Sequence, residues 1–209
     1  VYKMVSAHLK DERLRQAFSI QPLLVGGNPF TTTSIYSLIH YLERKWGVHF
    51  AMGGTGAIVA GFEKLLREEG VEIKTNTTVT KIITQHRRVT GVELDNSEKP
   101  LSADLVVCNA DPPFVYEHLL DFPQRKRWSN WRLRQLRYSM GLFVLYFGTT
   151  RQYPEVAHHT ITMGPRYKEL LSDIFHKKHL ATDMSLYLHR PTATDPTMAP
   201  AGCDTFYVL

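Results

Sequence analysis

The chain has 209 residues, of which 43% are hydrophobic and 11% aromatic, so it can bury a core as a globular protein. Its formal net charge of +5 is compatible with an acidic partner or an anionic surface and carries no information about the fold. Cys108 and Cys203 belong to no paired motif, which excludes a disulfide scaffold and a cysteine-based zinc site, and the longest clean apolar run, 141–148, is too short to span a bilayer.

The first half of the chain is predicted to be largely helical. Residues 1–18 favour a helix, and a second helix is expected over 34–46, where the threonines at 31–33 offer N-cap hydroxyls. Gly47 should end this helix. Apolar residues recur on one face of it at helical spacing: Ile35, Leu38, Ile39, Leu42 and Trp46.

A third helix is expected to begin after Gly54 and to end before Gly70, the residue type favoured just past a helix C-terminus. Its buried stripe should consist of Ile58, Phe62, Leu65 and Leu66.

The pattern then changes to that of β-strands over 71–83, 88–95 and 104–110. The last segment is continuously apolar before Asn109, which predicts a strand covered on both faces. Asp111 and the two prolines after it should cap and start another helix. The rest of the chain is predicted as a basic segment at 124–137, strands at 141–148, 184–190 and 204–209, a helix at 165–179 and a proline-rich turn at 194–202.

Two glycine pairs, Gly26–Gly27 and Gly53–Gly54, stand at the edges of apolar stretches, where glycine lets the backbone approach something bulky. Asn109, Ala110 and Asp111 follow the predicted buried strand, where ligands bind in open α/β sheets. A plainer interpretation, a helix followed by an antiparallel meander with glycines at turns, is equally compatible with these residues. Neither G-x-G-x-x-G nor a P-loop occurs, so a nucleotide site built by this chain alone is not expected.

No catalytic residue and no metal site are assigned from the sequence. His158 and His159 are adjacent, and neighbouring strand residues point to opposite faces, so we expect them not to share an ion. Asp173 and His176 are expected to form a local polar pair on a helix.

The run LLVGGNPF at 23–30, followed by GGTGA at 53–57, resembles the bacterial phytoene desaturases, the carotenoid-desaturase branch of the flavin-containing amine oxidoreductases. The similarity continues through GLFVLYFG, AHHTITMGPRYKELLSDIF and SLYLHRPTATDPTMAPAGC, and it covers essentially the whole chain. Members of this family carry a Gly-rich βαβ segment and a second flavin-binding segment, and neither is found in this sequence. The resemblance therefore implies a central piece of a longer enzyme, which alone should bind FAD weakly or not at all.

The resemblance implies an α/β, mixed α+β fold, with part of a Rossmann-like FAD-binding domain joined to part of a sheet-based substrate domain with helices. Residues 1–52 should be a helical part of the substrate-binding region, 53–123 part of the FAD-binding domain, and 124–209 part of the substrate-binding domain.

Individual positions also receive expected roles from the resemblance. The backbone of Val79 should lie against the adenine of FAD, with Asn109, Ala110 and Asp111 beside the cofactor. The expected substrate-pocket residues are Asn28, Pro29, Phe30, Tyr36, Gly53 and Gly54, and further apolar candidates are Ile35, Phe143, Leu145 and Phe147.

The implied activity is the FAD-dependent desaturation of a long apolar polyene such as phytoene, with a quinone or oxygen as the electron acceptor. A cytoplasmic enzyme bound peripherally to the cytoplasmic membrane is expected, and the arginines, Lys126 and the two tryptophans of 124–137 are candidate contacts with the membrane. Three alternatives stay open: a diapocarotenoid desaturase or other carotenoid oxidoreductase, a flavin amine oxidase, and a non-enzymatic basic module. No nucleic-acid partner is expected, because no nucleic-acid-binding motif occurs.

Overall fold

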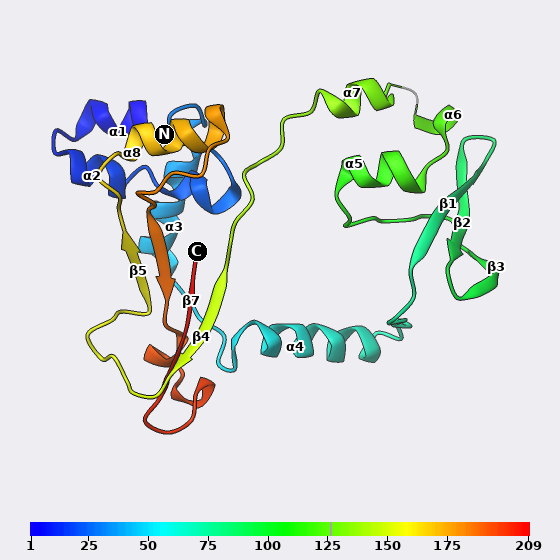
Figure 1. Ribbon diagram of the computed structural model, residues 1–209. Coiled ribbons are helices and arrows are strands. Elements are labelled where there is room, and N and C mark those ends of the chain that lie inside the picture. The colour runs from blue at the N-terminus through cyan, green and yellow to red at the C-terminus, as the bar shows by residue number, and fades with distance from the viewer. Residues whose placement is uncertain (126) are drawn as a thin grey trace. The chain divides into compact units, whose positions relative to one another are not determined.

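The computed structural model describes residues 1–125 and 127–209, which form two compact units (Figure 1). Unit 1 comprises Val1–Leu65 and Ser139–Leu209, and unit 2 comprises Leu66–Tyr138. These boundaries differ from the expected ones, which followed residues 52 and 123, and the roles expected for each part stay predictions. The combination of helices with β-sheets confirms the predicted mixed α/β class.

Unit 1 contains one sheet and several short helices. Its elements are α1 (Tyr2–His8), α2 (Glu12–Ala17), the 3₁₀ turns η1 (Gln21–Val25) and η2 (Ser34–Ser37), α3 (Leu38–Trp46), β4 (Leu145–Thr149), β5 (His159–Thr162), α8 (Tyr167–Ser172), the π-helical turn η4 (Asp173–Lys177), β6 (Leu186–His189), the 3₁₀ turns η5 (Pro191–Ala193) and η6 (Pro196–Met198), and β7 (Asp204–Val208). Helix α4 (Gly54–Glu68) crosses the boundary between the units.

The sheet of unit 1 has the strand order β4-β7-β6-β5, and every neighbouring pair is antiparallel (Figure 1). Phe147 of β4 lies opposite Phe206 of β7, and their rings stack with centroids 5.3 Å apart. Phe206 is buried, so this pair stabilises the contact of the edge strand β4 with β7.

The helices of unit 1 bury an apolar cluster centred on Tyr167. Leu170 and Leu171 follow it on α8, and all three side chains are buried. The Tyr167 ring lies 5.7 Å from that of Phe30, and its hydroxyl is 3.2 Å from Ser19 Oγ. The turn that contains Phe30 therefore packs against α8 through its aromatic ring.

Unit 2 is an antiparallel meander followed by short helices. Its elements are β1 (Val79–Gln85), β2 (Arg88–Leu94), β3 (Ser97–Ser102), α5 (Pro112–Phe114), the π-helical turn η3 (Val115–Leu119), α6 (Phe122–Arg125) and α7 (Asn130–Arg134). Ile82 and Val92 face each other across β1 and β2, and together with Leu119 of η3 they form the buried core.

Several predicted helix ends are confirmed, because they depend on local backbone geometry. Gly47 and Gly70 both adopt positive φ, at 79° and 74°. Beyond α4, Val71 N–H donates to Leu66 O at 2.9 Å and Gly70 N–H to Arg67 O at 3.1 Å. This pair of bonds is the Schellman arrangement that ends a helix.

Two burial predictions are wrong for the described chain. The expected buried stripe of α4 is exposed, with Phe62 at 61% and Ile58 at 47%. Residues 104–110 belong to neither sheet, and Leu105 and Val107 are 77% and 88% exposed. An apolar segment becomes a buried strand only when neighbouring strands pair with it, and none of the described strands does so.

Smaller differences concern where elements begin. The strand predicted at 141–148 starts only at Leu145, and the helix predicted from residue 34 begins with a 3₁₀ turn. Among residues 1–125 and 127–209, no helix combines the length and apolarity needed to cross a membrane.

Candidate functional site

The second glycine pair forms the turn that starts α4. Gly53 and Gly54 have φ values of 84° and 76°, a conformation that side chains disfavour. The Gly53 N–H donates to Asp195 Oδ2 at 2.6 Å, across 142 residues of sequence. Asp195 is 1% exposed, and its Oδ1 accepts hydrogen bonds from the N–H and the hydroxyl of Thr197. These bonds, first the Thr197 hydroxyl and then the Gly53 N–H, lower the pKa of Asp195 despite its burial.

The absence of a side chain at Gly54 matters for packing as well. A Cβ built on Gly54 would lie 2.9 Å from Met198 Cε, too close for an ordinary contact. The backbone of this pair therefore approaches the turn that carries Asp195 and Met198. In the described chain the bulky neighbour of the glycines is protein.

The first glycine pair is also enclosed by protein. A Cβ on Gly26, which has a φ of 70°, would lie 2.6 Å from Ser139 Cβ, and one on Gly27 would lie 2.9 Å from Thr32 Oγ1. Asn28 and Pro29 follow and are buried. Asn28 Oδ1 accepts from the Phe30 N–H at 3.0 Å, so the asparagine stabilises its own turn.

The expected substrate-pocket residues thus divide into two turns of unit 1, residues 28–30 and 53–54, with Tyr36 half-buried in η2. Asn28, Pro29 and Gly54 are buried, Phe30 and Tyr36 are partly exposed, and Gly53 is exposed. Their role towards a substrate stays a prediction.

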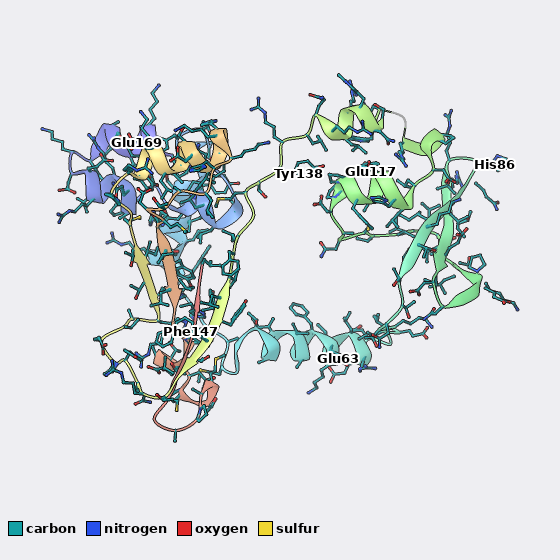
Figure 2. The ribbon with its side chains drawn as sticks, in the orientation of Figure 1. Glu63, His86, Glu117, Tyr138, Phe147 and Glu169 are labelled. Atoms are coloured by element: carbon teal, nitrogen blue, oxygen red, sulfur yellow. The ribbon has the colours of Figure 1, made fainter. Side chains whose placement is uncertain are left out.

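An exposed apolar surface lies along β4 and the segment before it, and Figure 2 labels one of its residues, Phe147. Phe143 is 84% exposed, Tyr146 74%, Leu145 51% and Phe147 39%. This surface belongs to the described residues of unit 1 and contains three of the further apolar candidates named above.

The residues expected near a cofactor all lie in unit 2. Val79 is the first residue of β1, opposite Leu94, and is 37% exposed. Asn109, Ala110 and Asp111 are exposed at the end of the extended segment 104–110, and Asp111 precedes α5 without capping it through its side chain. Contact of the main chain at these exposed positions with a cofactor stays a prediction. They supply no binding site for a diphosphate, because the sequence holds no glycine-rich phosphate loop.

A buried ion pair lies next to the Asp195 turn, and the sequence analysis missed it. Arg190 Nε donates to Asp204 Oδ2 at 2.8 Å, with the two side chains 9% and 0% exposed. Thr192 Oγ1 donates to Asp204 Oδ1 at 2.5 Å and the Tyr153 N–H to Oδ2 at 2.6 Å. Burial alone would raise the pKa of Asp204, but the bonds from Thr192 and Arg190 outweigh it and the pKa is lowered.

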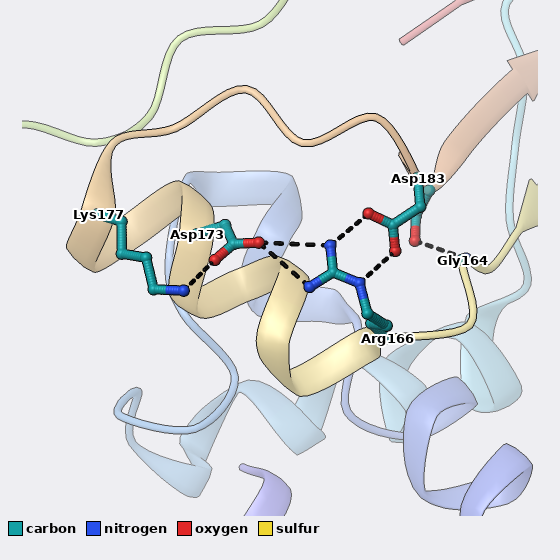
Figure 3. A network of polar contacts seen from close by, with 6 residues as sticks. Gly164, Arg166, Asp173, Lys177 and Asp183 are labelled. Atoms are coloured by element: carbon teal, nitrogen blue, oxygen red, sulfur yellow. Dashed lines mark hydrogen bonds and ion pairs between the residues drawn. The ribbon is translucent and has the colours of Figure 1, made fainter.

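A second ionic network surrounds Arg166 at the start of α8 (Figure 3). Arg166 donates to both carboxylate oxygens of Asp183 and, at 3.4 Å, to Asp173 Oδ2. Lys177 Nζ donates to Asp173 Oδ1 at 2.7 Å. The partners of Asp173 are therefore Lys177 and Arg166 rather than His176, because the i, i+4 spacing of Lys177 brings its ammonium to the carboxylate.

Three histidines lie close together at one end of the sheet. This differs from the expectation that His158 and His159 point to opposite faces of a strand. One ring nitrogen from each of His158, His159 and His189 lies within 4.8 Å of the other two. His158 Nε2 is 2.7 Å from His189 Nε2. Burial, followed by the neighbouring histidines, lowers the pKa of His189 to about 4, and burial also lowers that of His158. The chain bends at His158, so strand alternation does not govern its side chain.

Comparison with known proteins gives matches over most of this chain. Residues 3–183 match the family model of the flavin containing amine oxidoreductases. The chain is 49% identical over 212 residues to a neurosporene-forming phytoene desaturase of Cereibacter sphaeroides, covering 100% of this chain and 41% of that protein. It is 49% identical over 209 residues to a lycopene-forming phytoene desaturase of Pseudescherichia vulneris, covering 100% and 42%. It is 40% identical over 209 residues to a zeta-carotene-forming phytoene desaturase of Myxococcus xanthus, covering 100% and 40%. The chain thus spans about two fifths of the length of these curated relatives.

Proposed function

We propose, from the premise that this chain belongs to the flavin containing amine oxidoreductase family, that the full-length protein is an FAD-dependent carotenoid desaturase of the phytoene type. The observation that carries the proposal is the 49% identity along the whole chain to relatives named phytoene desaturases. The relatives differ in the product that their names give, so the number of double bonds introduced is left open.

Bound FAD would accept the hydride removed from the substrate, and the residues of this chain would position the two partners. The main chain of the exposed residues Val79 and 109–111 would contact the cofactor. An unactivated hydrocarbon offers no charge to bind, so its site must be apolar, and the exposed surface around Phe143 and Tyr146 has that character. Contact with a polyene would also exclude water from this surface.

We also propose that the basic segment contacts an anionic membrane surface from which the substrate is taken. Arg127, Arg132, Arg134 and Arg137 are exposed, as is Trp131 at 70%. Arg125 instead donates to Leu120 O, Glu117 O and Asn130 Oδ1, and Trp128 stacks on Tyr116, so both serve the unit itself. Lys126 lies outside the described residues.

A quinone or oxygen would reoxidise the flavin.

The activity is tested with full-length protein, FAD and a quinone added to liposomes that contain phytoene. More strongly conjugated carotenoids should accumulate with FAD and not without it, as measured by chromatography with absorbance detection. Absence of any such product, together with FAD reduction by an amine substrate, would refute the proposal in favour of an amine oxidase.

The apolar surface is tested with Phe143→Ser, using Leu180→Ser as a matched control in the same unit. Both side chains are strongly exposed, at 84% and 78%, so neither change should disturb folding. Loss of a phenyl contact should lower kcat/KM for phytoene by about tenfold or more in the first variant only. Equal kcat/KM values in the two variants would show that the substrate binds elsewhere.

A further inference from the structure

The histidines at the edge of the sheet are brought together by the pairing of β5 with β6. His159, the first residue of β5, lies directly opposite His189, the last residue of β6. Residues opposite each other in an antiparallel pair project from the same face. The neighbouring His158 O accepts a hydrogen bond from the Arg190 N–H at 2.8 Å, which fixes the bend that turns His158 towards His189.

The spacing of the three ring centroids is close to that of imidazoles bound to one ion, and because the His159 and His189 rings lie nearly parallel, at 9°, one of them must turn to direct its nitrogen at the ion. Their centroids are separated by 4.4 Å for His158 and His159, 4.6 Å for His158 and His189, and 5.2 Å for His159 and His189. With a Zn–N bond of about 2.0–2.1 Å, an ion lies roughly 3.2 Å from each ring centroid. Two such rings are then about 4.5 Å apart at a right angle and about 5.2 Å apart at a tetrahedral angle.

Neighbouring side chains hold the other nitrogens of two rings. His158 Nδ1 lies 2.5 Å from Thr194 Oγ1, and His159 Nδ1 lies 2.6 Å from the Tyr187 hydroxyl. Metal-bound histidines are oriented in this way by a hydrogen bond at the second ring nitrogen. His159 Nε2 is thereby left for a ligand, and His158 Nε2 faces His189 Nε2 at 2.7 Å.

The third ring contains a polar atom that the protein does not satisfy. His189 is 8% exposed, and its Nδ1 is buried without a hydrogen-bond partner among the described residues. His189 Nε2 faces His158 Nε2 and is therefore the ligand nitrogen of this ring, so Nδ1 is a second polar atom that the ion does not satisfy.

We propose that His158, His159 and His189 form a binding site for one divalent transition-metal ion, with Zn²⁺ as the representative occupant. The ion takes the place of the proton shared by His158 Nε2 and His189 Nε2, and these atoms separate from 2.7 Å to about 3.3 Å. Three imidazoles favour Zn²⁺, Co²⁺, Ni²⁺ or Cu²⁺, whereas Mg²⁺ and Ca²⁺ take oxygen ligands. The fourth position is open to a small ligand.

The experiment uses tag-free, full-length protein that has been treated with a chelator. Titration with Co²⁺, followed by absorbance, and equilibrium dialysis with Zn²⁺ should show one ion per chain, without competition from Mg²⁺. The His159→Ala and His189→Gln variants should each bind at least about 100-fold more weakly, and Thr194→Val about tenfold more weakly. His8→Ala, which changes an exposed histidine on α1, is the matched control and should bind like wild type.

His159 is exposed, so His159→Ala is expected to fold even if the His189 variant does not, and circular dichroism checks both. Wild-type protein that retains no Zn²⁺, or equal Zn²⁺ affinity in wild type and His159→Ala, would overturn the proposal. Neither result depends on desaturase activity, so the metal site and the proposed function are tested separately.

Discussion

The Arg190–Asp204 ion pair provides the sharpest test of how unit 1 is held together. Replacing Arg190 by methionine preserves much of its volume and removes the guanidinium. Asp204, which is fully buried, then keeps its bonds from Thr192 and Tyr153 and loses its only counter-ion among the described residues. Removing one partner of a buried ion pair costs about 3–5 kcal/mol, because the other charge stays buried without compensation. Arg13→Met, an exposed change on α2, should cost less than about 0.5 kcal/mol.

Hydrogen–deuterium exchange in the full-length protein measures this effect without requiring the whole molecule to unfold reversibly. Peptides that cover β6 and β7 should exchange about 10²–10⁴ times faster in Arg190→Met, since about 1.4 kcal/mol corresponds to a factor of ten. Peptides from β1 in unit 2 should exchange at the wild-type rate and serve as the internal control.

The pH dependence gives the prediction a second, independent readout. In the wild type the pKa of Asp204 is lowered on folding, so its contribution is present above the unfolded pKa and is lost as the pH falls through the folded value. In the variant, loss of the arginine leaves this pKa above its wild-type value, so the cost is greatest at neutral pH and shrinks as acid protonates the carboxylate. A difference below threefold in β7 exchange at pH 7, or one that grows towards pH 4, would refute the reasoning.

Three further predictions concern the glycine turn, the basic segment and the Arg166 network. Gly54→Val should abolish desaturation in soluble full-length protein, because a branched side chain is strained at its φ of 76°, whereas Gly56→Val, with open space around it, should stay active. Activity in both variants would leave Gly54 without a specific role. Wild type should sediment with anionic vesicles and be released by salt, because each basic residue near the membrane surface contributes on the order of 1 kcal/mol to binding. A variant with Arg127, Arg132, Arg134 and Arg137 changed to glutamine should stay in the supernatant. Sedimentation equal to wild type would place the membrane contact elsewhere. Arg166→Ala should speed hydrogen exchange in α8 more than Lys177→Ala does, because Arg166 bridges two carboxylates and Lys177 contacts one; the reverse order would contradict the contacts in Figure 3.

Features set by neighbouring residues could be predicted from the sequence. Gly47 and Gly70 end their helices because the left-handed conformation is a local requirement of the chain. The strands β6 and β7 and the helix α8 were also recognisable from local pattern and turn signals. The resemblance to the desaturases likewise rested on local blocks of sequence, and the family match confirms it.

Burial and long-range contacts could not be predicted in the same way. The stripe of α4 and the segment 104–110 have patterns that favour burial, but a pattern does not say which surface covers them. The bond from Gly53 to Asp195 joins residues 142 positions apart, and no spacing rule indicates it. The histidine cluster depends on the register of β5 and β6, which places His159 opposite His189.

The segment 189–195, where the sequence predicted the end of a strand at 184–190 and the start of a proline-rich turn at 194–202, connects the histidine cluster, the Arg190–Asp204 ion pair and the Gly53 turn of unit 1. His189 belongs to the histidine cluster, Arg190 pairs with Asp204, Thr194 contacts His158, and Asp195 holds the turn at Gly53. A shift of one residue in strand register would reverse which face each strand side chain occupies. Such a shift in β6 would remove His189 from the cluster and displace Arg190 from its carboxylate together. The buried ion pair therefore fixes the position of the histidines as well as the stability of the sheet, and Arg190→Met should weaken Zn²⁺ binding as well as protection of β7.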